Sequence, residues 1–149
     1  MSHHRNPKIA GREAAERALA AAGIDRADFV FMFASVGYEQ RALLDAVRAA
    51  TGDAPLAGGS GGGIIAGLEA DESNFSVAVM TISSDELLFK NATASGLKVD
   101  SEAAGRTIAQ NLACEMQPDT LGLIMLGDGL TLNFDRFAAG LKNELQLDR

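Results

Sequence analysis

The sequence is poor in the residues that most often carry enzyme chemistry. It has one cysteine (Cys114), two histidines (His3 and His4) and no tryptophan. A single cysteine excludes an internal disulfide and fits a reducing compartment, so we expect a cytoplasmic protein. Both histidines precede the first expected helix, which leaves the folded part without a histidine base, and Cys114 falls among apolar helix residues. Nucleophilic catalysis therefore has little support, and we predict that the protein is not an enzyme.

Several other classes of function are also disfavoured by what is missing. No cluster of Cys and His residues is present, and the acidic residues are scattered over expected helix surfaces, so we predict no metal site. No apolar run approaches the length of a membrane span, and the polar residues 1–7 do not resemble a signal peptide. The formal charge of −7 repels phosphate backbones, so we expect neither a membrane nor a nucleic-acid partner.

The remaining composition is that of a globular protein. The chain has 149 residues, of which 47% are hydrophobic and 22% charged, which suits one domain with a sizeable core and a polar tail at residues 1–7. Helix-forming residues, apolar spacing and caps such as Gly23 and Asp100 predict helices over 8–22, 39–50, about 100–116, and from 134 to the end of the chain. Apolar runs between turn residues predict strands over 28–33, 55–57, 74–82, 87–95 and 121–126.

This order of elements predicts an α/β fold with a mixed sheet of about five strands and about four flanking helices. Residues 28–57 read as a β-α-β unit with parallel strands. Residues 74–95 read as an antiparallel hairpin with a turn at residues 83–85, and residues 121–126 as a further buried strand. We expect a single domain without repeats or linkers.

The most distinctive segment is the glycine-rich run from Gly58 to Gly63, which we expect to be a loop. Its Gly61-x-Gly63-x-x-Ala66 pattern nominally matches a dinucleotide fingerprint, but residues 64–70 leave no room for the long helix that this fingerprint requires. No Lys-Ser/Thr pair follows the glycines either. Two interpretations remain open. The backbone N–H groups could bind a phosphate or carboxylate, or the glycines could form a tight turn packed against another part of the protein.

Polar, glycine-containing loops follow three of the expected strands, at residues 35–38, 58–63 and 127–133. If those strands are parallel and adjacent, the loops meet at one edge of the sheet, where ligands of open α/β sheets bind. Tyr38 could stack on a ligand there or complete the core. Asp128 could hydrogen-bond a ligand or serve as an ordinary turn residue.

The sequence resembles the N-terminal domain of the FIST family (F-box and intracellular signal transduction proteins) over about residues 9–147. The resemblance rests on the apolar strand 29–33, on Leu56-Ala-Gly-Gly-Ser-Gly-Gly-Gly-Ile64, on the strand 76–82, and on Leu126-Gly-Asp-Gly-Leu130 before an amphipathic helix. The family typically has Gly-Cys-Ser and Gly-Glu-Ile in the glycine motif. Here Gly59 and Gly63 stand in place of the Cys and Glu.

The resemblance implies a non-enzymatic sensory domain that binds a small ligand such as an amino acid and signals to a partner protein. It implies a pocket formed by Ser60, Gly61, Gly62, Asp128 and Gly129. With the neighbouring loop residues, the candidate ligand-binding set is Ser35, Tyr38, Gly59, Ser60, Gly61, Gly62, Asp128 and Gly129.

Some family members bind haem. We expect no cofactor here, because no histidine lies within the expected fold to serve as an axial ligand. The family usually continues into a C-terminal domain, and we expect that domain to be absent here. The alternatives to a sensor are a module that pairs through its sheet edge with a second copy or with that C-terminal domain, a haem-based gas sensor, and, with least support, an enzyme for phosphate or acyl groups.

Overall fold

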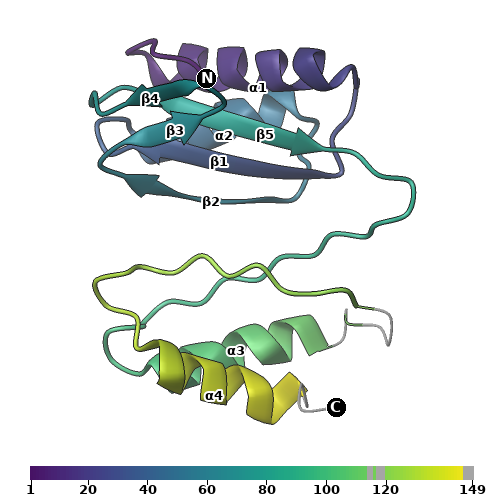
Figure 1. The fold of residues 1–149 in the computed structure, drawn as a ribbon, viewed down its shortest axis with the longest axis vertical. Helices are drawn as coiled ribbons and strands as arrows, with labels where there is room; N and C mark the ends of the chain where they lie inside the picture. The colour runs from purple at the N-terminus through teal and green to yellow at the C-terminus, as the bar shows by residue number, and fades with distance from the viewer. Residues whose placement is uncertain (114–115, 117–119, 146–149) are drawn as a thin grey trace. The chain divides into compact units, whose positions relative to one another are not determined.

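The computed structural model describes residues 1–113, 116 and 120–145, which fall into two compact units (Figure 1). The first unit, residues 1–89, contains two helices and five strands. The second, from residue 90 onward, contains two helices. The helices are α1 (Pro7–Ala22), α2 (Gln40–Ala50), α3 (Ser101–Ala113) and α4 (Phe134–Leu145). The strands are β1 (Phe29–Ser35), β2 (Leu56–Gly61), β3 (Ile64–Ala66), β4 (Glu69–Asp71) and β5 (Val77–Ile82). Cys114 lies outside the described residues.

The main sheet of the first unit has the strand order β2-β1-β5. β1 and β2 are parallel and joined through α2, which confirms the predicted β-α-β unit. β5 runs antiparallel to β1 on its other side, so the sheet is mixed, as predicted. The α/β class is therefore confirmed, although this sheet has three strands rather than about five.

The structure contradicts the strand predictions in two segments. β5 pairs with β1, not with residues 87–95, so the predicted hairpin is wrong. Residues 87–95 and 121–126 form no strand pair with any described residue, and Leu88 and Ile124 are more than three-quarters exposed. An apolar run is compatible with a strand, but a strand also needs a neighbouring backbone to bond with. In addition, β3 and β4 form a separate short hairpin around Gly67, whose φ of 62° suits a tight turn.

The core of the first unit lies between the sheet and its two helices. Side chains alternate along β1, so Val30, Met32 and Ala34 point toward the helices. They pack with Leu43 and Val47 of α2, which are fully buried, and with the alanines of α1. Burying each such aliphatic side chain contributes about 1.5–3 kcal/mol. The predicted apolar face of α2 and one face of the apolar strand β1 thus build this core.

The opposite face of β1 carries a row of three phenylalanines. The ring centroids of Phe29 and Phe31 lie 5.1 Å apart, and those of Phe31 and Phe33 lie 6.5 Å apart. Phe89 covers Phe29 at 5.4 Å, whereas Phe33 remains 39% exposed. Figure 1 shows the β3–β4 hairpin on the side of the sheet opposite to α2. This second face is therefore only partly covered within the first unit.

The N-terminal residues are integrated into the first unit rather than forming the expected polar tail. Ser2 is 1% exposed; its N–H donates to the Val77 carbonyl at 2.9 Å, and its own carbonyl accepts from the Val77 N–H at 3.0 Å. The Ser2 hydroxyl also donates to Glu13 of α1 at 2.8 Å. Asn6 then caps α1, accepting from the Lys8 N–H at 3.0 Å. These bonds tie the chain start to the β5 edge of the sheet.

The second unit is organised by close packing of α3 against α4. A β-carbon added at Gly105 would overlap the Phe137 carbonyl oxygen, and one added at Gly140 would overlap the Glu102 carbonyl oxygen. Glycine is therefore required at both positions for the two backbones to approach this closely. The predicted cap Asp100 is confirmed, because its Oδ1 accepts from two N–H groups at the start of α3 at 3.1 Å.

The two glycines in the middle of β2 should respond differently to the same substitution. A β-carbon at Gly58 would overlap the backbone of Met32, whereas a β-carbon at Gly59 has nothing within 4 Å. We expect Gly58→Ala to destabilise the first unit by about 3 kcal/mol because β2 must move away from β1. Gly59→Ala should change stability by less than about 0.5 kcal/mol. Urea unfolding of both variants measures this difference, and equal effects would contradict the close contact.

Candidate functional site

The glycine-rich segment is mostly a strand rather than the predicted loop. β2 continues through Gly61, and only Gly62 and Gly63 lie between it and β3. Gly59 and Ser60 lie on β2, which is an edge strand of the sheet, and both are exposed. The carboxyl ends of the parallel strands β1 and β2 lie at the same edge of the sheet, where ligands of α/β sheets commonly bind. Gly59 and Ser60 therefore lie exposed just before the edge of the sheet at which β1 and β2 end.

The turn formed by Gly62 and Gly63 offers accessible backbone donors, and we call it the glycine turn. Both residues are exposed, and neither N–H donates a hydrogen bond to a described residue outside strand pairing. A β-carbon on Gly62 would meet nothing within 4 Å. A β-carbon on Gly63 would lie 3.3 Å from Cγ of Glu72, so this side chain borders the turn. The Glu72 side chain is exposed and makes no ion pair with any described residue.

Asp71 fixes the backbone beside the glycine turn. Its carboxylate accepts hydrogen bonds from the N–H and the hydroxyl of Ser73, both at 2.8 Å. Nδ1 of His3 lies 2.7 Å from Oδ2 of the same carboxylate. The Ser73 backbone bond, followed by the Ser73 hydroxyl and the smaller effect of His3, lowers the pKa of Asp71 below its ordinary value of 3.8. Asp71 is therefore held in place, whereas the Glu72 side chain next to it is exposed.

Two predicted site residues, Ser35 and Tyr38, have their polar atoms engaged within the first unit. The Ser35 hydroxyl donates to the Ser76 carbonyl at 3.0 Å and accepts from the Ser76 N–H at 2.8 Å. Tyr38 is 5% exposed, and its hydroxyl donates to the His4 carbonyl at 3.0 Å. Its ring packs edge-on against Phe75 at 5.4 Å. In this arrangement both side chains hold the loop after β1 to the rest of the unit.

The other predicted pair, Asp128 and Gly129, belongs to the second unit. Asp128 Oδ1 accepts from the Leu130 N–H at 3.0 Å, and Oδ2 accepts from the Thr131 hydroxyl at 2.8 Å. The Leu130 bond, and then the Thr131 bond, lower the pKa of Asp128 below 3.8. The structure thus brings the glycines of β2 and the glycine turn together in one unit, and closes a local turn with Asp128 in the other.

Sequence reasoning did not single out Glu72. The available signal was the polar run 71–74 between the glycine segment and the apolar strand β5. Reading it as part of a site required knowing that β3 and β4 form a hairpin. This hairpin brings residues 63 and 72 together because Ile64 pairs with Asp71.

Two features are absent from the described residues. No three His, Cys, Asp or Glu side chains among them lie close enough together to hold a metal ion. None of the helices formed by these residues is both long and apolar enough to cross a membrane. Fold and site together define a mixed α/β protein with a glycine turn at the carboxyl end of its parallel strands.

The comparison with known families agrees with this description. The family model for the FIST N domain matches residues 28–148, and the chain belongs to this family. FIST domains are sensory domains of signal transduction and are not a family of enzymes. No curated protein and no solved structure matches the chain significantly.

The lowered pKa of Asp71 predicts how its contribution to stability depends on pH. The folded state favours the ionised carboxylate, so the contribution is present at neutral pH and is lost as the pH falls through the folded pKa, below 3.8. We therefore expect Asp71→Asn to lower the melting temperature at pH 7 and to have little effect near pH 2. Thermal unfolding of both proteins across this range tests the prediction. A difference that grows as the pH falls would contradict it.

Proposed function

We propose that this protein is a ligand-binding sensory domain whose glycine turn binds a small zwitterionic ligand of the amino-acid class. The observation that carries the proposal is the juxtaposition of two groups: the exposed backbone N–H groups of Gly62 and Gly63, which donate no hydrogen bond outside strand pairing to a described residue, and the Glu72 carboxylate, which has no ion-pair partner among those residues. Membership of a sensory family supports the same function.

The N–H groups of the glycine turn and the neighbouring Glu72 carboxylate suit the two opposite charges of such a ligand. Backbone N–H groups in a glycine-rich turn can bind anions, because no side chain covers them. They would receive the carboxylate of the ligand. The exposed Glu72 side chain would receive its ammonium group through a charge-assisted hydrogen bond. A neutral or purely anionic compound would satisfy only one of these groups.

The surrounding structure supports a fixed geometry for this turn. β2 is held against β1 by the close approach at Gly58, and Asp71 anchors the other side through Ser73 and His3. The donors and the carboxylate are therefore attached to paired strands, which reduces the conformational entropy lost on binding.

Thermal-shift measurements of the full chain with the twenty amino acids, simple carboxylates and simple amines test the proposal. An amino acid at a hundred times its dissociation constant should stabilise the protein by about 2.7 kcal/mol, or roughly 5 °C or more. We expect Glu72→Gln to weaken binding of that amino acid about tenfold, because a charge-assisted hydrogen bond is lost.

Matched variants test whether the ligand binds at the glycine turn or elsewhere on the surface. Gly62→Val should weaken binding without unfolding the protein, since a β-carbon at this position meets nothing within 4 Å. Glu86→Gln changes the charge equally at an exposed loop of the same unit and should leave binding unchanged. The proposal fails if no amino acid shifts the melting temperature, or if Glu86→Gln weakens binding as much as Glu72→Gln.

A second candidate function, dimerisation through the sheet, is favoured by the character of the β2 edge. β2 contains no charged residue, and Gly58, Gly59 and Ser60 are exposed at the edge of the sheet. Edge strands of monomeric proteins are usually protected by charges, prolines or bulges. In size-exclusion chromatography with light scattering, we expect a concentration-dependent dimer that Ser60→Lys abolishes. A strict monomer at high concentration would exclude this function.

A further inference from the structure

The β3–β4 hairpin is separate from the main sheet, and we propose that it is a movable flap which His3 holds in its closed position. Its two strands pair with each other and not with β1, β2 or β5. Of residues 64–71 in this hairpin, Ile64 alone is buried, whereas Ile65 is 83% exposed and Leu68 is fully exposed. A two-stranded hairpin is marginally stable by itself, so its position depends on the few contacts that attach it to the unit.

The side chain of His3 contacts two carboxylates of β4, and we call this contact the latch. Nδ1 of His3 lies 2.7 Å from Oδ2 of Asp71, and Nε2 lies 3.9 Å from Oε2 of Glu69. Asp71 and Glu69 are two residues apart on the strand, so both lie on the same face of it. Within the described part of the chain, His3 is the only residue outside 61–73 whose side chain forms a hydrogen bond or ion pair with the hairpin.

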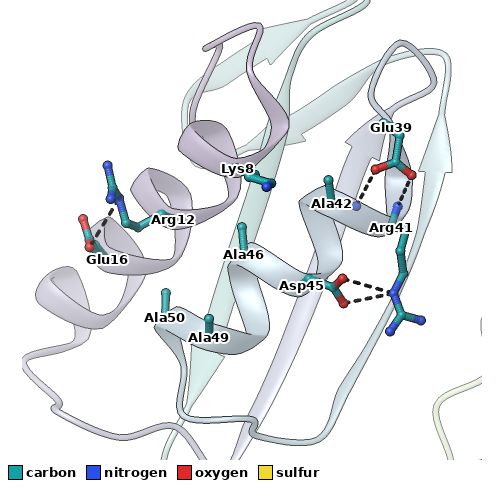
Figure 2. Close-up of a pocket in the computed structure, with 10 residues that line it drawn as sticks. All are labelled: Lys8, Arg12, Glu16, Glu39, Arg41, Ala42, Asp45, Ala46, Ala49 and Ala50. Carbon is teal, nitrogen blue, oxygen red and sulfur yellow. Dashed lines mark hydrogen bonds and ion pairs between the residues drawn. The ribbon is translucent and has the colours of Figure 1, made fainter.

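The backbone on both sides of His3 is fixed to the rest of the first unit. Ser2 exchanges two backbone hydrogen bonds with Val77 of β5, at 2.9 and 3.0 Å. The His4 carbonyl accepts a hydrogen bond from the Tyr38 hydroxyl at 3.0 Å. The segment then enters α1, which packs side by side with α2 (Figure 2). The latch therefore joins an exposed hairpin to a segment that is held at several points.

Movement of this flap changes the geometry of the glycine turn. Gly63 directly precedes β3 and Glu72 directly follows β4, so both lie at the base of the hairpin. Gly62 lies closer to β2, which is paired with β1 in the main sheet. Opening of the flap therefore changes the position of Glu72 relative to Gly62. The latch itself does not rest on the ligand proposed for this turn, and it is tested without one.

NMR relaxation dispersion on the isotope-labelled full chain measures opening of the flap, because the method detects motions on the microsecond to millisecond timescale. We expect His3→Ala to raise the population of the open state about threefold, since it removes an exposed ion pair. The change should extend over the whole hairpin, including Gly67 at its tip, while the amides of β1 stay unchanged. His3→Arg retains a side chain with several N–H donors and should restore the dispersion of the unmodified protein.

The neighbouring histidine provides a matched control. The His4 side chain bonds within its own segment, where Nδ1 accepts from the Asn6 N–H at 3.0 Å. His4→Ala removes the same ring one residue away and should leave the hairpin amides unchanged. The proposal is overturned if His3→Ala changes no hairpin amide, if it changes only residues 69–73 beside the lost contact, or if β1 changes as much as the hairpin. It is also overturned if His4→Ala has the same effect, or if His3→Arg does not reverse the effect of His3→Ala.

Discussion

The pairing of β1 with two neighbours of opposite direction is the constraint on which the first unit depends. β1 pairs parallel with β2 and antiparallel with β5, so its backbone groups are bonded on both sides. A strand this buried cannot leave those groups unpaired without a large free-energy cost. The parallel pairing requires a crossover, which α2 supplies, and the side chains of β1 that face α2 form the core. Sheet order, helix placement and core follow from this one strand.

Two sets of hydrogen bonds close the unit around β1. Ser35 at its end makes three hydrogen bonds with the backbone of Ser76, just before β5 begins. Ser2 exchanges two more with Val77, and Tyr38 reaches back to the His4 carbonyl. The loop after β1 and the chain start are thus tied to the same short segment. This explains why polar residues that resemble site residues in the sequence are buried in the structure.

The sequence predicted the parts of the fold that depend on local patterns. The apolar face of α2, the continuous apolar run of β1 and the caps at Gly23 and Asp100 all follow from residues close together in the chain. Which strands pair with one another does not follow from such local patterns. Residues 121–126 are as apolar as a buried strand, yet they form no strand pair within the part of the chain that the structure describes. Ser2 pairs with Val77 although nothing near residue 2 indicates a strand. Such pairings depend on which backbone lies alongside, and this is not encoded in the composition of either segment.

The sequence predicted the candidate site only in part, again because local patterns do not show which backbone lies alongside a segment. A run of glycines indicates that something approaches the backbone closely, but it does not distinguish a neighbouring strand from a ligand. The structure separates the two cases within five residues. At Gly58 the space of a side chain is taken by the backbone of Met32, so glycine is needed for packing. At Gly62 that space is open, and packing gives no reason for a glycine there. Because this difference depends on which backbone lies alongside each glycine, the run of glycines alone could not predict it.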